Sequence, residues 1–296
     1  MLESEPTIGF IGLGIMGKPA AKNLVDAGYE LLVNDVREEP IEELKAHGAA
    51  SRATPKAVTS DSDVVITFLP EGKHVREVAL GEDGIIEGAT DGQVYIDMST
   101  IGPSAIREVA DELDEHGVET VDAPVSGSEE GAREAWMSIM IGGDEAVVEA
   151  CWELFEVMGG NVVRVGDTGA GQTAKICNNM IVAAEVTGLA EALVFAEKAG
   201  ISQRNLVEAI SGGAAQTWAL DTRAERMIEG DFEPGFFGSY MYKDLRIAAA
   251  DGEAYGVPMA LTSANHELFK SMELRGDGEL DFSGVMRLYE DLAGVE

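Results

Sequence analysis

Basic residues and cysteines are scarce in this chain of 296 residues. Lys and Arg number 21, only nine of them Lys, against 54 Asp and Glu, so the formal net charge is −33. A chain with so little positive charge is not expected to bind nucleic acid or an anionic membrane surface. The two cysteines, Cys151 and Cys177, form no CxxC motif and follow no secretory signal, which excludes a disulfide-stapled domain and predicts a reducing cytoplasm.

Metal-ligand spacing and long apolar runs are also missing from the sequence. The four histidines, at positions 47, 74, 116 and 266, stand apart, so we expect no metal site. No run approaches the roughly 18 consecutive apolar residues that a membrane span requires. With 45% hydrophobic residues the chain can nevertheless bury large cores, and its length predicts two domains.

The acidic residues are spread through every segment of the chain rather than gathered in a tail. An evenly carboxylated surface is typical of a halophilic cytoplasm, where concentrated salt shortens the Debye length to roughly 3 Å and screens the repulsion. The alternative is a mesophilic protein with an acidic surface. We expect a halophilic protein.

The first half of the chain alternates short β-branched runs with helical periodicity. Three of the helical segments end at Gly28, Gly48 or Gly117, in the position that favours left-handed backbone. This βαβ alternation predicts a doubly wound, mainly parallel sheet of the Rossmann type, with helices on both faces. Strands are expected over residues 7–11, 31–34, 64–69, 94–98, 119–122, 138–141 and 162–165.

The second half of the chain contains only helical periodicity. A glycine-rich turn at 166–171 separates it from the strands, so we expect a Rossmann-type domain over 1–167 and an all-helical domain over 168–296. Helices are expected over residues 173–199, 205–210, 219–228, 242–254 and 261–272.

A glycine motif, Gly12-Leu13-Gly14-Ile15-Met16-Gly17, follows the first strand and opens the first helix. The acidic residue Asp35 stands 18 positions after Gly17, at the end of the second strand. A strand before, a helix after and an acid about 20 residues further on form the fingerprint of dinucleotide binding. The glycines let backbone N–H groups and the helix dipole meet the pyrophosphate, and the carboxylate can accept both ribose hydroxyls.

The same acid bears on the choice of cofactor. The carboxylate of Asp35 repels the extra phosphate of NADP, so we expect NAD to be preferred. Arg37 and Lys18 leave NADP open as the less favoured cofactor, because either cation could bind that phosphate.

Two later strand ends could also contact the cofactor. Leu69 and Pro70 follow one strand and Thr100 follows the next, where a parallel sheet presents its carboxyl ends. Taken alone, these residues also fit an ordinary turn and a helix cap before Pro103.

Two motifs favour a small acid as the substrate. Ser126-Gly127-Ser128 can form a turn whose hydroxyl and N–H groups bind one carboxylate. Lys175 and Asn179 are four residues apart, so a helix places them on one face. Flanked by Ile176 and Cys177, the lysine could be partly desolvated, which would lower its pKa toward a value suited to proton transfer. Alternatively, it is a surface lysine in a polar pair.

Over essentially its whole length, the chain resembles the β-hydroxyacid dehydrogenase family, which includes 3-hydroxyisobutyrate dehydrogenases and tartronate semialdehyde reductases. The resemblance implies a Rossmann domain that holds NAD and a helical domain that closes over it and forms a homodimer or homotetramer. It rests on residues 9–17, Asp122-Ala-Pro-Val-Ser-Gly127, Gly169-Ala-Gly171 with Lys175-Ile-Cys-Asn-Asn-Met180, and Lys243-Asp244-Leu245.

The resemblance also implies roles for individual residues. Lys175 would be the general acid/base at the substrate oxygen, and Asn179 would position that oxygen. The substrate carboxylate would be bound by Ser126, Gly127 and Ser128. The cofactor would be contacted by Leu69, Pro70, Thr100 and Lys243.

The chain departs from the family pattern beside the carboxylate-binding turn. The family has glycine where Ser128 stands, and Gly-Thr or Gly-Asn where this chain has Ala135-Trp136. Trp136 could occupy part of the substrate pocket or pack beneath the turn. These changes bear on the identity of the substrate and not on the class of reaction.

Two segments of the sequence point to different substrates. Gln216-Thr217-Trp218 resembles the 3-hydroxyisobutyrate branch, whereas residues 75–86 resemble the tartronate semialdehyde branch. Trp218, Phe236 and Phe237 would give the pocket apolar walls, which favours a methyl-bearing acid over glycerate.

We therefore expect an NAD-dependent oxidoreductase that interconverts a small 3-hydroxy acid, such as 3-hydroxyisobutyrate, and its semialdehyde. One alternative is a tartronate semialdehyde reductase that makes glycerate. A non-catalytic dinucleotide-binding protein or chromatin reader on the same scaffold should have lost Lys175 and Asn179, both of which are present. A larger phosphorylated sugar acid is disfavoured by the scarcity of cations.

Overall fold

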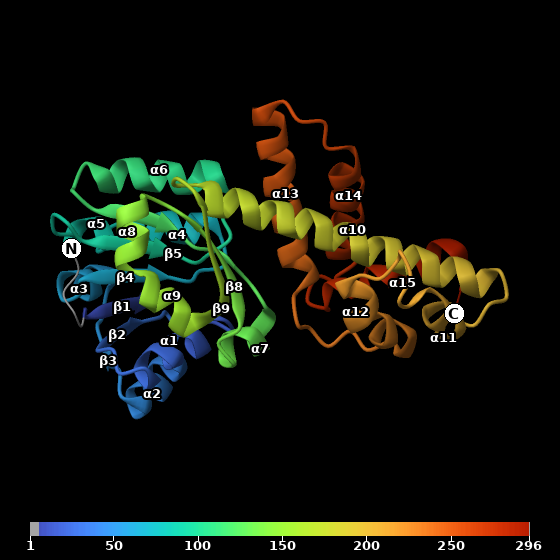
Figure 1. Ribbon diagram of the computed structural model, residues 1–296, viewed down its shortest axis with the longest axis horizontal. Coiled ribbons are helices and arrows are strands. Elements are labelled where there is room, and N and C mark those ends of the chain that lie inside the picture. Colours follow the sequence, from blue (N-terminus) through green and yellow to red (C-terminus); the bar gives the residue numbers. More distant parts are fainter. Residues whose placement is uncertain (1–5, 296) are drawn as a thin grey trace. The chain divides into compact units, whose positions relative to one another are not determined.

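The computed structural model describes residues 6–295. It divides the chain into two compact units that meet in sequence at Lys175 and Ile176 (Figure 1). The first unit combines strands and helices, and the second is helical. The predicted fold class, a Rossmann-type domain followed by an all-α domain, is confirmed.

A nine-stranded sheet forms the centre of the first unit. Six strands run parallel in the order β3, β2, β1, β4, β5, β6, which is the Rossmann order. Beyond them, β8 runs antiparallel to β6 and β7 and parallel to β9. The strands are β1 (Ile8–Ile11), β2 (Leu31–Asn34), β3 (Ala50–Ser51), β4 (Val64–Thr67), β5 (Val94–Asp97), β6 (Glu119–Asp122), β7 (Val125–Ser126), β8 (Met137–Gly142) and β9 (Gly159–Gly166).

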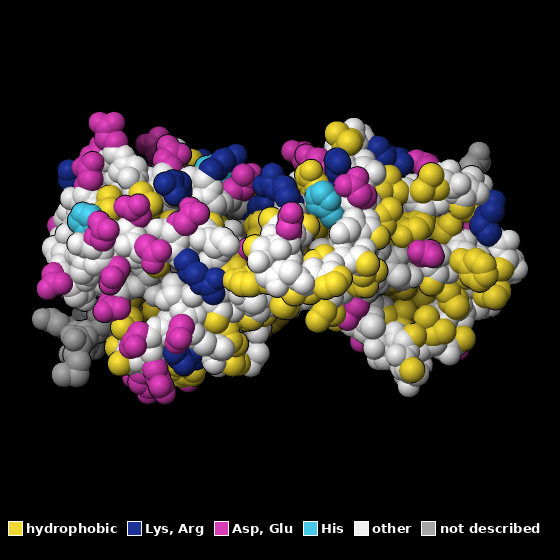
Figure 2. All heavy atoms as spheres, turned by 90° about the horizontal axis from the view of Figure 1, so that it is seen from above, with side chains coloured by type: hydrophobic (Ala, Val, Ile, Leu, Met, Phe, Trp, Pro, Cys, Tyr) yellow, Lys and Arg dark blue, Asp and Glu magenta, His cyan; other side chains and the backbone are white. Residues whose placement is uncertain are grey.

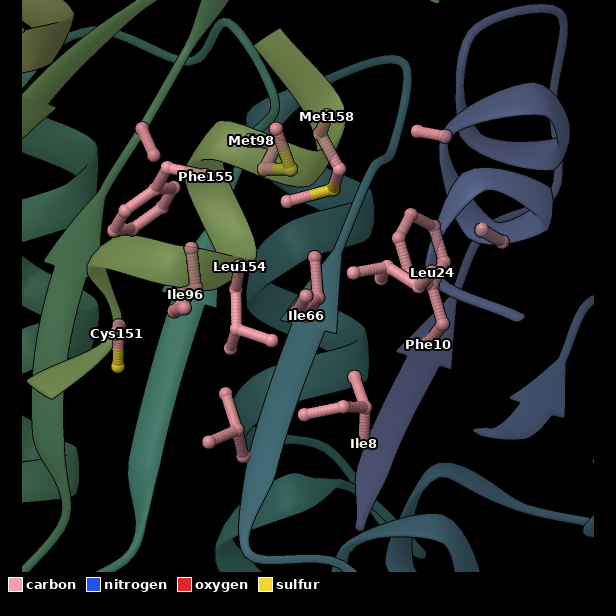
Figure 3. Close-up of a cluster of buried hydrophobic side chains, with 14 of the residues drawn as sticks. Ile8, Phe10, Leu24, Ile66, Ile96, Met98, Cys151, Leu154, Phe155 and Met158 are labelled. Carbon is pink, nitrogen blue, oxygen red and sulfur yellow. The ribbon is translucent and has the colours of Figure 1, made fainter. Parts of the chain in front are cut away.

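Two hydrophobic cores lie on opposite faces of this sheet, because successive strand residues point to opposite sides. Ile8 and Phe10 belong to the core of one face and Ile11 to the core of the other. The first core packs against α1 (Gly17–Asp26), α2 (Glu38–His47), α7 (Ser128–Arg133), α8 (Glu145–Ala150) and α9 (Trp152–Met158). Figure 3 shows Leu24 of α1 and Leu154 of α9 beside the strand residues of this core. The second packs against α3 (Pro55–Ser60), α4 (Gly72–Leu80), α5 (Ile85–Gly88) and α6 (Pro103–Asp114).

The second unit is built around the long helix α10 (Ala170–Lys198), which begins in the first unit. Its residues Ala183, Val186, Ala190 and Leu193 recur at helical spacing and are buried in the core of this unit. The helices that follow are α11 (Gln203–Ile210), α12 (Trp218–Glu229), α13 (Gly238–Tyr255), α14 (Ala260–Leu274), the short 3₁₀ helix η1 (Phe282–Val285) and α15 (Met286–Ala293).

The observed elements agree with the predicted ones apart from their ends and four short additions. Gly28, Gly48 and Gly117 have positive φ, as their positions after helices predict. The sequence analysis missed β3 and β7, which have two residues each and are too short to show a period, and it also missed η1 and α15.

Helix α10 departs from the expectation that no segment resembles a membrane span. By length and composition alone it is apolar enough to cross a membrane, and half of its most apolar window is buried within the protein. The core helix of a protein that does not enter membranes meets the same criterion, so this finding is weak evidence for a span.

Candidate dinucleotide and substrate sites

The three glycines of the loop between β1 and α1 have different surroundings. Gly12 has φ +98°, and a Cβ there would lie 2.5 Å from the carbonyl oxygen of Phe68. A Cβ on Gly17 would lie 2.1 Å from the carbonyl oxygen of Gly12, so only glycine lets α1 begin this close to the loop. Among the described residues, nothing lies within 4 Å of the position of a Cβ on Gly14.

This loop fits the pyrophosphate of a dinucleotide. The open side of Gly14 lets a ligand approach the backbone, and no side chain caps the N-terminus of α1. The N–H of Lys18 already donates to the carbonyl oxygen of Gly14 at 3.1 Å and Pro19 has no N–H, so an anion at this end of α1 is favoured mainly by the helix dipole. In the same loop Leu13 is buried, Met16 is partly buried and Ile15 is exposed.

Asp35 follows β2, and its carboxylate is hydrogen-bonded to the glycine loop. The N–H of Leu13 donates to Oδ2 at 2.6 Å, and the N–H and Nε of Arg37 donate to Oδ1 at 2.8 and 3.0 Å. Burial raises the pKa of Asp35, but the hydrogen bonds from Arg37 and Leu13 outweigh it, so the pKa lies below its usual value. The carboxylate is therefore ionised, and a guanidinium is held beside it.

A buried hydrogen-bond network fixes the loops that follow β4 and β5. Asp97 Oδ1 accepts from Thr67 Oγ1 at 2.8 Å and from Ser99 Oγ at 2.6 Å, and the N–H of Leu69 donates to Ser99 Oγ at 2.8 Å. The network joins the carboxyl ends of two neighbouring parallel strands. The predicted cofactor contacts Leu69, Pro70 and Thr100 lie in these two loops.

The first turn of α10 is fixed at the carboxyl end of β6. Asp122, which is fully buried, accepts from the N–H of Gly169 at 2.6 Å and from the N–H of Gln172 at 2.7 Å. A Cβ on Gly171 would lie 2.3 Å from the carbonyl oxygen of Met140, so the Gly-Ala-Gly motif allows this close approach. Burial raises the pKa of Asp122 to about 6, against the lowering effect of these N–H donors.

Lys175 follows this anchored turn on α10. The side chain of Gln172, one turn earlier, accepts from the N–H groups of Ile101 and Gly102 and donates to the carbonyl oxygen of Ser99. The start of the helix is thereby attached to the loop after β5. Lys175 is only 6% exposed, so it is not the surface lysine of the alternative interpretation.

The turn Ser126-Gly127-Ser128 joins β7 to α7. Ser126 pairs with Ser138 of β8, Gly127 has φ +156° and Ser128 has φ +59°. Trp136 lies against this turn, because a Cβ on Gly127 would lie 3.3 Å from its Cζ3 atom. The indole therefore packs on the turn, which was one of the two arrangements left open by the sequence.

In the second unit, Asn179 is hydrogen-bonded to Asp244 of α13, which also pairs with Lys243. Its Nδ2 donates to Asp244 Oδ2 at 2.5 Å, and Lys243 Nζ lies 3.2 Å from Asp244 Oδ1. Asn178 Nδ2 donates to the amide oxygen of Asn179 at 2.9 Å. Asn179 and Asp244 are both buried, so the orientation of the Asn179 amide is fixed from both sides.

The predicted aromatic residues of the second unit form one cluster. Phe282 contacts two of them. The ring of Trp218 stacks on that of Phe282 with 6.4 Å between the ring centroids, and the ring of Phe236 meets it edge to face with 5.8 Å between the centroids. The guanidinium of Arg223 lies 4.7 Å from the ring centre of Trp218 and 3.3 Å from the buried carboxylate of Asp281. Phe237 contacts Tyr240.

The sequence analysis gave no role to several residues that organise these sites. Asp122 and Asp244 stood inside quoted motifs, so their positions were a signal, whereas the others carried none that a single sequence reveals. These residues are Asp97, Asp122, Gln172, Arg223, Asp244 and Asp281. Among residues 6–295, no group of three or more His, Cys, Asp or Glu side chains could hold a metal ion.

Two family models match the chain in succession. The model described as the NAD binding domain of 6-phosphogluconate dehydrogenase matches residues 7–166. The model described as the NAD-binding region of NADP-dependent 3-hydroxyisobutyrate dehydrogenase matches residues 169–289. Together they cover both units.

Known proteins resemble the chain over nearly its full length. The 2-hydroxy-3-oxopropionate reductase of Escherichia coli is 41% identical over 287 residues, which are 97% of this chain and 98% of that protein. The mitochondrial 3-hydroxyisobutyrate dehydrogenase of Mus musculus is 36% identical over 293 residues, 97% and 88% of the two chains. The structure of Mycobacterium tuberculosis 3-hydroxyisobutyrate dehydrogenase with L-serine matches with a TM-score of 0.89 at 35% identity. The match covers 96% of this chain and 99% of that chain.

Proposed function

Because this chain belongs to the β-hydroxyacid dehydrogenase family, we propose that it interconverts a small 3-hydroxy acid, of the 3-hydroxyisobutyrate type, and its semialdehyde. It is an NAD(P)-dependent oxidoreductase that acts on CH–OH groups. The observation that carries the proposal is the pairing of a buried lysine, Lys175, with an asparagine of fixed orientation, Asn179, one turn apart on α10.

Lys175 transfers the proton that belongs to the substrate hydroxyl. Its ammonium group donates to the oxygen during reduction, and its neutral form accepts the proton during oxidation. The amide of Asn179 positions that oxygen, since Asp244 and Asn178 hold the amide in one orientation. When bound, the dinucleotide supplies the hydride chemistry.

The turn after β7 binds the carboxylate of the substrate. Ser126 contributes its hydroxyl, and Gly127 and Ser128 contribute N–H groups, which together suit one carboxylate. The dinucleotide is held by the glycine loop, Asp35 and the loops of Leu69, Pro70 and Thr100, with Lys243 as a further contact. The break between the matched family models, at 166 and 169, supports a domain boundary between residues 167 and 168. We assign dinucleotide binding to residues 1–167, and cleft closure and oligomerisation to residues 168–296.

The preference for a methyl-bearing acid rests on the aromatic cluster of Trp218, Phe236 and Phe282. Trp218 is half exposed and supported from beneath by Arg223, so a rigid apolar surface is available to a methyl group. The test is an assay of kcat/KM for 3-hydroxyisobutyrate and glycerate with NAD and with NADP. We expect the methylated acid to be preferred, and Trp218→Ala to reduce its kcat/KM while changing that for glycerate little.

A second candidate is tartronate semialdehyde reduction to glycerate. It is favoured by the 41% identity to the Escherichia coli 2-hydroxy-3-oxopropionate reductase. A higher kcat/KM for glycerate than for 3-hydroxyisobutyrate would select this candidate. Equal losses on both substrates in Trp218→Ala would mean that the tryptophan supports the fold and not the choice of substrate.

We also infer the setting in which the enzyme works. NAD is the preferred cofactor, because Asp35 is ionised at the position that would meet the extra phosphate of NADP. The net charge of −33 suits a cytoplasm with concentrated salt. The exposed apolar side chains of the second unit support a homodimer or homotetramer formed through the helical domain.

A further inference from the structure

The segment between β7 and β8 holds two residues, one at the start of α7 and one just after its end, in a backbone conformation that side chains disfavour. Ser128 has φ +59° and Ala135 has φ +54°, and only Asp83 shares this property among the non-glycine residues that the structure describes. The Cβ of an L-residue crowds its own carbonyl at such angles. Contacts around the segment 126–137 must therefore hold it in place.

The indole of Trp136 supplies contacts of this kind from one side. A Cβ on Gly131 would lie 3.1 Å from Cζ3 and 3.2 Å from Cε3, and one on Gly127 would lie 3.3 Å from Cζ3. The six-membered ring thus packs directly on the backbone of both glycines. The main chain of Trp136 is also attached, because its N–H donates to the carbonyl oxygen of Gly131 at 3.0 Å.

A second anchor comes from the helix that the glycine loop opens. Asn23 on α1 donates from Nδ2 to the carbonyl oxygen of Ala132 at 2.7 Å. This hydrogen bond holds the middle of the segment. At the turn, Gly127 is contacted by the indole and by Met137 of β8, and its carbonyl oxygen accepts from the N–H of Gly131 at 2.9 Å. Trp136 itself remains 48% exposed, so its packing on the turn is not explained by burial in the core.

We propose that Trp136 is a positioning residue for the carboxylate of the substrate. By packing on Gly127 and Gly131, it keeps the Ser126 hydroxyl and the N–H groups of the turn directed at one point. This inference rests on the proposed function of the turn. Because the indole acts on the binding of the carboxylate and not on the reacting oxygen, its loss should change KM more than kcat.

The test is steady-state kinetics of Trp136→Ala with the best hydroxy acid. We expect KM for the acid to rise about tenfold, as expected when charge-assisted hydrogen bonds are weakened, while kcat and KM for the dinucleotide stay within about threefold. Trp136→Phe should recover most of the affinity because its ring can pack on the same glycines. Trp152→Ala is the matched control, since it removes a partly buried indole from α9 of the same unit, and it should leave KM unchanged.

A compensation experiment tests whether the indole of Trp136 holds the backbone of the turn in place. Glycine adopts positive φ without strain, so adding Ser128→Gly and Ala135→Gly to Trp136→Ala should lower KM toward the wild-type value. The methyl ester of the substrate provides a second check, because Trp136→Ala should not change its kcat/KM. An equal loss on ester and acid, or no recovery by the glycines, would overturn the inference.

Ser126→Ala separates this inference from the function on which it rests. If Ser126→Ala leaves KM for the acid unchanged, the turn does not bind the carboxylate and both ideas fail. If Ser126→Ala raises KM but Trp136→Ala does not, the turn binds the carboxylate without help from the indole, and only the role of Trp136 is wrong.

Discussion

The two units of the chain differ in net charge and in the number of large hydrophobic side chains that they expose. Up to Lys175, 34 Asp and Glu stand against 12 Lys and Arg, a net charge of −22, whereas from Ile176 onward 20 stand against 9, a net charge of −11. The shorter second unit nevertheless carries ten of the 15 large exposed hydrophobic side chains found among the described residues. Figure 2 shows acidic side chains scattered over the first unit and apolar patches over the second.

This contrast indicates that salt acts differently on the two surfaces. Screening by salt relieves the repulsion among the carboxylates, which concerns the first unit most. Salts that strengthen apolar association act mainly on the second unit. An acidic surface that stays hydrated and an apolar surface available for contact with another copy are together what an oligomer in concentrated salt requires.

The largest expected effect concerns the point where the two units meet in sequence. Lys175 is the last residue of the first unit, and Asn179 lies in the second. Lys175→Ala should reduce kcat by at least about 10²-fold and leave dinucleotide binding nearly unchanged, because it removes the group that we propose transfers the proton. Asn179→Ala should be milder, since the amide orients the oxygen without transferring a proton. Turnover of Lys175→Ala within threefold of the wild type would exclude the lysine from the mechanism.

The contrast between the surfaces predicts where subunits associate. On α10, Ile181 is 61% exposed and Phe195 is 74% exposed, and both stand seven residues from Gly188, so the face is nearly symmetric about its centre. A symmetric face suits contact between two copies around a twofold axis.

Charges introduced on this face should therefore dissociate the proposed oligomer. In sedimentation velocity, we expect the wild type to sediment as an oligomer at 2 M KCl, and Ile181→Glu combined with Phe195→Glu to sediment as a monomer. Val163→Glu, at an exposed valine of β9 in the first unit, is the matched control and should leave the assembly intact. For the wild type, dilute buffer should promote dissociation and molar KCl should reverse it. An assembly that is unchanged by the double variant would place the interface elsewhere.

The difference between local and long-range signals explains what the sequence could predict. The glycine loop, the parallel strands and α10 follow from spacing within short segments, and the structure contains all of them. The hydrogen bond between Asn179 and Asp244 joins residues 65 positions apart, and no local pattern specifies it. The strand β8 was predicted, but its antiparallel direction was not, because a single run of strand residues does not reveal the direction of its neighbours.

The two units each contain a buried carboxylate, and that of the first unit predicts a dependence of stability on pH. Asp122 is fully buried and accepts from backbone N–H groups, whereas Asp281 in the second unit is paired with Arg223. The pKa of Asp122 is about 6, raised mainly by burial, against about 4 in the unfolded chain. Between these values the folded chain keeps a proton that the unfolded chain has released, so the stability contributed by Asp122 falls as pH rises.

Asp122→Asn removes this titration. The free energy of unfolding of the variant, relative to that of the wild type, should increase by up to about 3 kcal/mol from pH 4 to pH 7. Urea unfolding at constant salt and several pH values measures the difference. Parallel pH profiles for the two proteins would show that the carboxyl of Asp122 titrates in its usual range.

The smallest expected effect concerns the cofactor and uses the ion pair of Asp35 and Arg37 in the first unit. We expect kcat/KM to be higher with NAD than with NADP in the wild type, because the ionised carboxylate repels the extra phosphate. Asp35→Ser removes the repulsion and breaks the ion pair with the guanidinium, which lies 3.0 Å from the carboxylate. The guanidinium then keeps only its hydrogen bond to the carbonyl oxygen of Leu13 in this loop and can turn to bind that phosphate. The ratio of kcat/KM for NAD to that for NADP should therefore fall about tenfold, equivalent to about 1.4 kcal/mol. Adding Arg37→Ala should reverse the gain with NADP and leave NAD nearly unaffected. A wild-type enzyme that uses NADP as well as NAD would mean that Arg37 already leaves Asp35 when the phosphate binds, and that the pair selects neither cofactor.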